Sequence, residues 1–264
     1  MDSSVLCFDL DSMLLDREGK IHPADIVILA SRPRSWFVPT TGRALDSVKR
    51  MFHRNGLFLD QPIPFPMVLL NGAAIYLPGE ELYSYSPFSQ LVQRTLIGLV
   101  EDFPEPSYLF MDEKEIYLRS SSGSFHPMLD RFDIKASDFG DGIRHESFGK
   151  VMVISENPDQ LLSIADFLET RHLERVYTLK NVLELSPPGV TKTAGIKSLV
   201  QLLGWKMGQI ITASAGEDDS AMLELAGVSF TAASSPAKIL KLVKHVIDVQ
   251  KEGLLGPMQR AGSA

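Results

Sequence analysis

The sequence has little cysteine, no long apolar run and no excess of positive charge, and each of these absences excludes a class of protein. Its one cysteine, Cys7, cannot form a disulfide within the chain, so a reducing compartment is expected. No apolar run approaches the ~20 residues that cross a bilayer, and no basic region precedes an apolar stretch at the start, as it would in a signal peptide. These absences predict a soluble, cytoplasmic protein without a membrane partner.

The charge balance argues against polyanionic partners. The formal net charge is −7 over 264 residues, and an acidic field repels nucleic acid and anionic membrane surfaces. A local basic pocket for a small anion is compatible with this balance. Hydrophobic residues make up 44% of the chain and charged residues 22%, as in ordinary globular proteins, so the length allows one large domain or two modest ones.

The stretch from Val5 to Ser12 is the most informative in the chain. An apolar run at 5–8 suits a strand buried on both faces of a parallel sheet, and it stops at two carboxylates, Asp9 and Asp11. Two acids that face one crevice repel each other unless a cation or a shared proton relieves them. The pair therefore indicates either a divalent metal site or a base beside a nucleophile. A purely structural alternative is that these residues cap the turn that follows the strand.

Strands and helices alternate at both ends of the chain. Four further apolar runs, at 36–39, 67–70, 209–213 and 228–231, predict strands with helices between them. This alternation predicts an α/β fold with one doubly wound, Rossmann-like parallel sheet. Pro39 cannot donate to a sheet ladder, so its strand should lie at an edge or end there.

The middle of the chain has short β-like and amphipathic segments, which predict an inserted α+β cap domain. We expect a core of residues 1–81 and 187–264 and a cap of residues 82–186. Near the end, residues 236–249 predict an amphipathic helix, and the tail from Gly253 predicts no regular structure.

Polar residues follow several of the predicted strands. They are Asp9 and Asp11, Thr41 and Gly42, Asn71, and the acidic run 217–219. Each taken alone is more typical of a turn or a solvated loop. Because the carboxyl ends of parallel strands lie along one edge of a doubly wound sheet, however, these groups are expected to share one crevice.

Five segments carry a resemblance to a known family. They are Phe8–Asp11 (D-x-D), Thr40–Arg43 (T-G-R), Leu70–Ala73 (N-G-A), Pro188–Lys192 (G-V-S-K) and Ser214–Leu223 (G-D-x-x-N-D-x-x-M-L). In order and spacing they resemble the haloacid dehalogenase superfamily, and within it the Cof-type (type IIB cap) sugar-phosphate phosphatases. The resemblance covers essentially the whole chain. It implies a Mg²⁺-dependent phosphatase core and a cap that acts as a lid and selects a small phosphorylated metabolite, such as a sugar phosphate.

The resemblance also implies roles for individual residues. Asp9 would be the nucleophile that forms an aspartyl-phosphate, and Asp11 would protonate the leaving alcohol and then activate water. The phosphate-binding and substrate-binding residues would be Thr41, Gly42, Arg43, Asn71, Lys192 and Asp218. The Mg²⁺ ligands would be Asp9, Asp11, Asp218 and Asp219. For Arg43 a salt bridge with the helix that it precedes is an alternative.

The last of these segments departs from the family pattern. Ala215 stands where the family has an aspartate that binds Mg²⁺ directly, and Asp218 stands where it has asparagine. Ala cannot coordinate a hard cation, whereas Asp218 restores the lost negative charge, and a shifted loop would bring Glu217 or Asp218 to the metal. Three functions stay open: an active phosphatase, a non-catalytic phosphosugar-binding relative and a phosphosugar mutase. The sequence is silent on the oligomeric state and on which substrate is bound.

Overall fold

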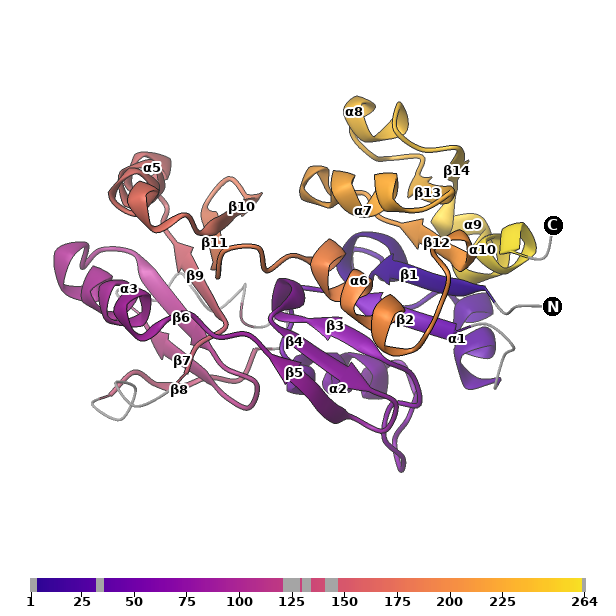
Figure 1. Ribbon diagram of the computed structural model, residues 1–264, viewed down its shortest axis with the longest axis horizontal. Helices are drawn as coiled ribbons and strands as arrows, with labels where there is room; N and C mark the ends of the chain where they lie inside the picture. The colour runs from indigo at the N-terminus through magenta and orange to yellow at the C-terminus, as the bar shows by residue number, and fades with distance from the viewer. Residues whose placement is uncertain (1–3, 32–35, 121–128, 130–133, 141–146, 263–264) are drawn as a thin grey trace.

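The computed structural model describes residues 4–31, 36–120, 129, 134–140 and 147–262, and it shows two sheets side by side (Figure 1). The larger sheet has the strand order β14-β13-β12-β1-β2-β3-β4-β5. Its strands are parallel from β14 to β3, and β4 and β5 are antiparallel to their neighbours. The prediction of a doubly wound α/β sheet is therefore confirmed.

The elements of this half come from both ends of the chain. The strands are β1 (Val5–Asp9), β2 (Trp36–Thr40), β3 (Met67–Leu69), β4 (Ala74–Leu77), β5 (Glu81–Tyr85), β12 (Ile210–Ala213), β13 (Val228–Ala232) and β14 (His245–Ile247). The helices are α1 (Pro23–Ala30), α2 (Leu45–Arg54), α6 (Lys192–Leu202), α7 (Ser220–Leu225), α8 (Ala237–Leu240), α9 (Val249–Glu252) and α10 (Leu255–Gly262).

The buried residues of β1 point alternately to the two faces of the larger sheet, as strand geometry requires. Leu6 and Phe8 belong to the core beneath α1, α2 and α10, whereas Val5 and Cys7 pack against α6 and α7. An apolar strand covered on both faces has its end fixed in position, and that end is Asp9.

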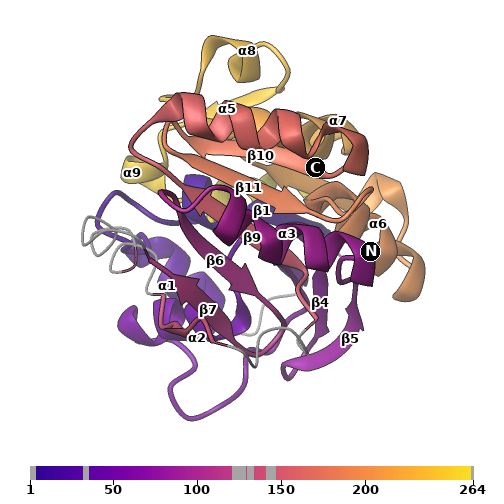
Figure 2. The ribbon, with the colours of Figure 1, turned by 90° about the vertical axis from the view of Figure 1, so that its left-hand side faces the viewer.

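The smaller sheet has the order β10-β11-β9-β6-β7-β8 and is formed by the middle of the chain. Its strands are β6 (Ser107–Met111), β7 (Ile116–Arg119), β8 (Ser137–Asp138), β9 (Lys150–Ile154), β10 (Glu174–Leu179) and β11 (Val182–Ser186). The helices α3 (Gln90–Asp102) and α5 (Pro158–Phe167) cover the face that points away from the larger sheet (Figures 1 and 2). The chain leaves the larger sheet at Tyr85, so the expected division at residue 82 cuts β5, and a division between Tyr85 and Gln90 fits the sheets better.

Two local expectations fail, and a third is met to within one residue. β2 lies between β1 and β3, but it ends at Thr40, one residue after Pro39, and it meets β3 only there. Residues 236–249 form the short helix α8 and the strand β14 instead of one helix. The tail forms α10, whose Leu255 and Met258 are buried against the core.

Within the part of the chain that the structure describes, we find no helix whose length and apolar character would let it cross a membrane. The cytoplasmic location stays a prediction.

Candidate active site

Asp9 lies at the carboxyl end of the interior strand β1, and its carboxylate is buried. Oδ2 accepts a hydrogen bond of 2.7 Å from the backbone N–H of Ser12, in the single π-helical turn η1 (Leu10–Leu14). Oδ1 lies 2.6 Å from Nζ of Lys192. Burial raises the pKa of Asp9, and the carboxylates of Asp219 and Asp11 add to this rise, while Lys192 opposes it. Asp9 therefore caps a turn and faces a cation at the same time.

Asp11 is engaged by two residues that follow β2. Oδ2 accepts a hydrogen bond of 2.8 Å from the hydroxyl of Thr41, and Oδ1 lies 2.6 Å from Nη2 and 2.9 Å from Nε of Arg43. Burial by itself would raise the pKa of Asp11, but the guanidinium of Arg43 and the bond from Thr41 hold it below its ordinary value. In this arrangement Asp11 is ionised.

Lys192 is the first residue of α6 and joins two carboxylates. Its Nζ lies 2.6 Å from Oδ1 of Asp9 and 2.9 Å from Oδ2 of Asp219. Burial would lower the pKa of Lys192, but Asp9, Asp219 and Asp218 raise it well above its ordinary value. Thr191 caps the helix by accepting the N–H of Ala194. A buried ammonium is thus fixed beside the carboxylate of Asp9.

The loop after β12 holds Asp219 in place. Ser214 donates a hydrogen bond of 2.6 Å to Oδ2 of Asp219, and Thr231 donates one of 2.7 Å to the carbonyl of Ser214. Ala215 lines the cavity with its apolar side chain, and Asp218 is exposed. Ser214 therefore anchors Asp219, the one buried acid of this loop.

We tested whether these residues fit a magnesium ion. Among the described residues, no group of three or more His, Cys, Asp and Glu side chains is arranged so that it could hold a metal. Asp9 and Asp219 do converge, on Nζ of Lys192, and Ala215 supplies no oxygen. Mg²⁺ is usually held by one or two carboxylates together with water and phosphate oxygens. Asp9 and Asp219 therefore fit this pattern as two carboxylates that could hold the ion together with water and phosphate oxygens.

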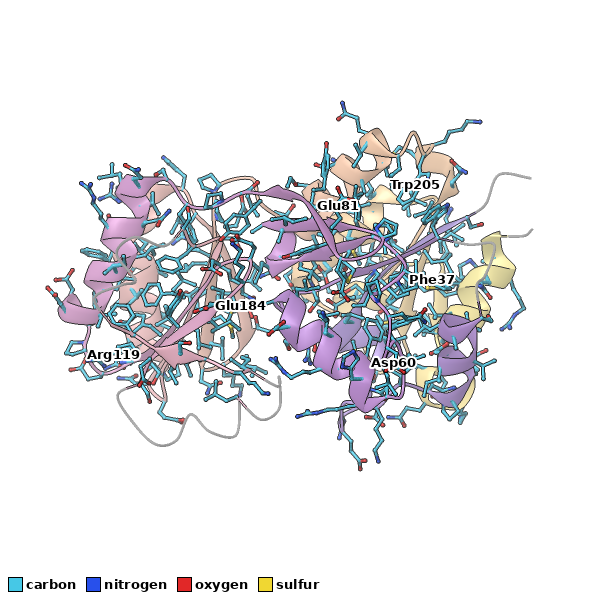
Figure 3. The ribbon with its side chains drawn as sticks, turned by 90° about the horizontal axis from the view of Figure 1, so that it is seen from below. Phe37, Asp60, Glu81, Arg119, Glu184 and Trp205 are labelled. Atoms are coloured by element: carbon cyan, nitrogen blue, oxygen red, sulfur yellow. The ribbon has the colours of Figure 1, made fainter. Side chains whose placement is uncertain are left out.

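Asn71 and Gly42 lie where the two sheets meet. Nδ2 of Asn71 donates to Oε2 of Glu184 at 2.7 Å, and Nζ of Lys150 lies 2.8 Å from the same oxygen. Lys150 also donates to the carbonyl of Gly42 at 2.8 Å. Although burial opposes it, the ammonium of Lys150 and these hydrogen bonds lower the pKa of Glu184. Two charged residues of the smaller sheet are therefore tied to the loops that follow β2 and β3 (Figure 3 labels Glu184 on the smaller sheet).

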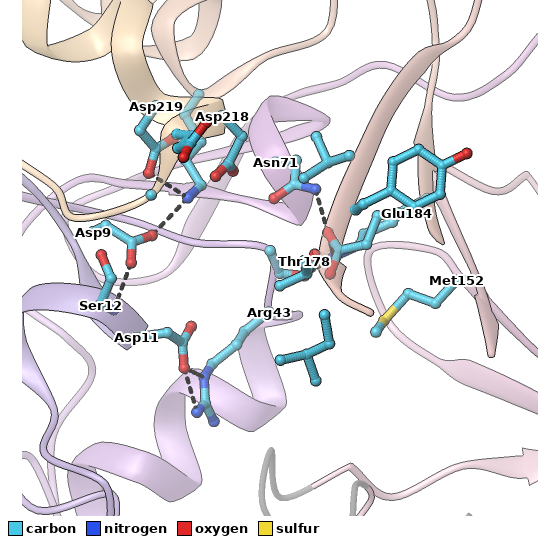
Figure 4. Close-up of a pocket in the computed structure, with 18 of the residues that line it drawn as sticks. Asp9, Asp11, Ser12, Arg43, Asn71, Met152, Thr178, Glu184, Asp218 and Asp219 are labelled. Carbon is cyan, nitrogen blue, oxygen red and sulfur yellow. Dashed lines mark hydrogen bonds and ion pairs between the residues drawn. The ribbon is translucent and has the colours of Figure 1, made fainter. Parts of the chain in front are cut away.

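A cavity of about 740 Å³ lies between the two sheets. Its walls are formed by the residues around Asp9 on one sheet and by Lys150, Glu184 and their neighbours on the other. In Figure 4 the acids of the core lie on one side, and Glu184, Thr178 and Met152 of the smaller sheet lie on the other. Of the predicted site residues, the cavity is lined by Asp9, Asp11, Gly42, Arg43, Asn71, Lys192, Asp218 and Asp219. Thr41 is fully buried behind Asp11.

Sequence reasoning missed four residues of this region. Ser12 and Ser214 fix the backbone and Asp219, and Lys150 and Glu184 join the sheets. A signal for the last two exists, because each is a charged residue in an otherwise apolar strand. Such a residue is rarely buried without a partner.

Comparison with known proteins places this geometry in context. The model of a family described as haloacid dehalogenase-like hydrolase matches residues 6–255. The fold is similar to solved structures that cover nearly the whole chain. A protein from Thermotoga maritima is 21% identical, with 98% of this chain and 97% of that chain covered and a TM-score of 0.79. A haloacid dehalogenase-like hydrolase from Bacteroides thetaiotaomicron is 16% identical, with 98% and 99% covered and a TM-score of 0.85.

A third similar structure is described as a sugar phosphatase of haloacid dehalogenase subclass IIB. It is 16% identical, with 99% of this chain and 100% of that chain covered and a TM-score of 0.79. At such identities the likeness establishes the fold, and the family match establishes the relationship.

Proposed function

Since the chain belongs to the haloacid dehalogenase-like hydrolases, we propose that it hydrolyses the phosphate monoester of a small phosphorylated metabolite through an aspartyl-phosphate intermediate. The observation that supports this most is the buried carboxylate of Asp9, which Ser12 and Lys192 hold at the wall of a large cavity. One similar protein is described as a sugar phosphatase, so a sugar phosphate is the first substrate class to test.

In the proposed first step, Oδ1 of Asp9 attacks phosphorus, and the bond from phosphorus to the ester oxygen breaks. Asp11 gives its proton to that oxygen, and the alcohol leaves. In the second step a water molecule attacks the aspartyl-phosphate and Asp11 takes its proton. The bond between phosphorus and Asp9 then breaks, which releases inorganic phosphate and restores both carboxyl groups.

The contact between Arg43 and Asp11 decides how the first step can begin. Bound to Arg43, Asp11 is ionised and has no proton to give. We propose that the phosphate of the substrate draws Arg43 away, because a guanidinium binds phosphate oxygens in the same bidentate manner. Without Arg43 beside it, Asp11 would lose the interaction that lowers its pKa most, which favours the protonated carboxyl group. Arg43 would thus bind phosphate and prepare the acid in one movement.

The other phosphate contacts proposed are the amide of Gly42 and the ammonium of Lys192. Thr41 was expected to bind phosphate too, but its hydroxyl is buried behind Asp11 and donates to that carboxylate, so we propose that it positions Asp11 instead. Asn71 and Asp218 line the same cavity and are proposed to contact the substrate. Mg²⁺ is the proposed cofactor, and Asp9 and Asp219 are the carboxylates that would hold it; when bound, it would neutralise charge on the transferred phosphoryl group. The smaller sheet with its helices would act as a lid over the cavity.

A second candidate function is favoured by Ala215. With one expected metal-binding carboxylate absent, the protein would bind a phosphorylated ligand without turning it over. The cavity and the basic side chains of Arg43 and Lys192 support binding equally well in both cases.

The two candidates separate in one experiment. Wild type and Asp9→Asn are assayed with p-nitrophenyl phosphate and acetyl phosphate at several Mg²⁺ concentrations, and thermal stabilisation by phosphate is measured in parallel. The phosphatase requires turnover by wild type that Asp9→Asn lowers at least about 1,000-fold, since the nucleophile is removed. Equal inactivity together with stabilisation by phosphate would establish the binding protein instead. Product analysis with a sugar bisphosphate tests for a mutase.

A further inference from the structure

The two faces of the smaller sheet contact different parts of the molecule. On one face, side chains of β6, β9 and β11 pack against α3 and α5. These side chains are Tyr108, Phe110, Val151, Val153, Leu183 and Leu185. Because neighbours along a strand point to opposite faces, the residues between them face the larger sheet and its acids.

The strand register arranges this second face in rows. One row runs across the sheet through Leu118, Leu109, Met152, Glu184 and Val176. The next contains Ile116, Met111 and Lys150. Met111, Ile116, Met152 and Val176 line the cavity, and Ile134 and Leu179 line it beside them. These six side chains form an apolar part of the wall that faces Asp9, and Lys150, Arg175, Tyr177, Thr178 and Glu184 line the same cavity from this side.

The charged residues of this sheet that line the cavity already have partners, and Arg175 donates a hydrogen bond to the carbonyl of Ala165 in α5. Lys150 and Glu184 are 2.8 Å apart, and they also contact the carbonyl of Gly42, Asn71 and Thr178. Both side chains are almost fully buried, with 2% and 9% exposed. Their polar groups therefore serve mainly to tie the two sheets together and leave few hydrogen bonds for a substrate.

We propose that the substrate is a phosphate monoester whose alcohol carries a ring or chain with a largely apolar surface, and not a free hexose phosphate. This inference rests on the proposed function, since it names the substrate class of the same site. The phosphate would lie among Gly42, Arg43 and Lys192, and the body of the alcohol would lie against Met152 and Val176. A volume of about 740 Å³ suits it, because pockets for ligands of drug size measure roughly 300–1,000 Å³.

The physical reason is the cost of hydroxyl groups without partners. A hexose phosphate presents a hydroxyl on nearly every carbon, and each one buried against Met or Val loses its hydrogen bonds to water. Such a loss weakens binding by about tenfold per group. An apolar ring of the same size loses nothing and gains the burial of its surface.

Two matched ligands test the proposal. Cyclohexylmethyl phosphate keeps the six-membered ring size, the methylene and the phosphate of glucose 6-phosphate but lacks the ring oxygen and the hydroxyl groups. Dissociation constants are measured by calorimetry with Asp9→Asn, and kcat/KM with wild type, with acetyl phosphate as a substrate too small to reach the wall. We expect cyclohexylmethyl phosphate to bind at least about 100-fold more tightly than glucose 6-phosphate. Equal or weaker binding, or no binding of either ring compound, overturns the inference.

Failure of the inference and failure of the proposed function look different. If no compound is turned over but cyclohexylmethyl phosphate still binds more tightly, the inference stands and the phosphatase does not. If acetyl phosphate is turned over and the preference is absent or reversed, the phosphatase stands and the inference does not.

Variants then locate the preference on the wall. The preference is expressed as the dissociation constant of glucose 6-phosphate divided by that of cyclohexylmethyl phosphate. Met152→Gln and the isosteric Val176→Thr should each lower this ratio by about tenfold. The ratio is taken within one protein, so partial loss of folded protein cancels. Met207→Gln makes the same chemical change at a solvent-exposed position before β12 of the larger sheet, and it should leave the ratio of dissociation constants unchanged. A ratio that neither wall variant alters contradicts the assignment.

Discussion

The backbone N–H of Ala215 donates a hydrogen bond to Oγ of Ser12 at 3.1 Å. This bond joins the loop after β12 to the turn that follows Asp9, although the side chain at position 215 lacks a carboxylate. The backbone of Ala215 therefore holds the two segments together, and its side chain supplies no oxygen that could bind a cation.

Ala215→Asp should restore a metal site. A third carboxylate beside Asp9 and Asp219 is expected to tighten Mg²⁺ binding by about 10-fold to 100-fold, measured by calorimetry on the free protein. Phosphatase activity at low Mg²⁺ should rise in parallel. Ala215→Asn is the matched control, because it has the same shape without the charge. Unchanged Mg²⁺ affinity in Ala215→Asp would show that this loop does not reach the metal.

The raised pKa of Asp9 predicts the acid side of the pH profile. The nucleophile must be ionised, and burial shifts its titration above the ordinary range of an aspartate. Activity should therefore fall on acidification at a higher pH than an exposed aspartate would give. Because Lys192 lowers the pKa of Asp9, Lys192→Met should move the acid limb of kcat/KM to still higher pH, besides lowering kcat. An acid limb that stays in place in Lys192→Met would contradict the contact.

Much of the fold was predictable because it rests on local patterns. Apolar runs that stop at polar residues predicted β1, β2, β3, β12 and β13, and the order of the motifs predicted which strand ends would meet. The C-terminal tail was not predictable, because its order depends on a distant residue. Asp25 in α1 accepts hydrogen bonds from the N–H groups of Leu254 and Leu255 at 2.8 Å each. The sequence near 254 contains no sign of that partner.

The same limit applied to the candidate site. The motifs in the sequence predicted that Asp9, Asp11 and Lys192 lie near one another. The sequence did not predict which side chains of the two sheets contact each other. Asn71 was expected to contact the substrate, and in the structure its amide donates to Glu184 of β11. This contact can be found only in the folded structure, since Asn71 and Glu184 are 113 residues apart in the sequence.

The buried ion pair of Lys150 and Glu184 joins the two sheets, and its contribution to the free energy of unfolding should depend on pH. Glu184→Gln leaves the ammonium of Lys150 without its counter-ion, and we expect the free energy of unfolding to fall by about 3–5 kcal/mol. The double variant Lys150→Met with Glu184→Leu removes both charges and should lose less. Denaturant unfolding measures all three proteins. A double variant less stable than Glu184→Gln would refute the assignment of the cost to the unpaired charge.

The sign of the pH effect follows from the lowered pKa of Glu184. A carboxyl group whose pKa is depressed by folding stabilises the protein above its unfolded pKa, and this contribution is lost as the pH falls through the folded value. Wild type should therefore lose more stability than the double variant between neutral and strongly acidic pH. Equal losses would mean that another group titrates in that range.

Gly72 offers a test of how closely the loops of the site approach each other. Its φ is +107°, and a Cβ there would overlap the backbone carbonyl of Thr191, the residue before Lys192. Gly79 has a φ of +87° but open space around it, so it is the matched control. Gly79→Ala should cost only the strained backbone, about 1–2 kcal/mol. Gly72→Ala should cost about 1–3 kcal/mol more in thermal or denaturant unfolding. It should also lower kcat by about 100-fold, because a displaced Thr191 moves Lys192 away from Asp9. If the two variants unfold alike, the close approach of Gly72 to Thr191 does not constrain the site.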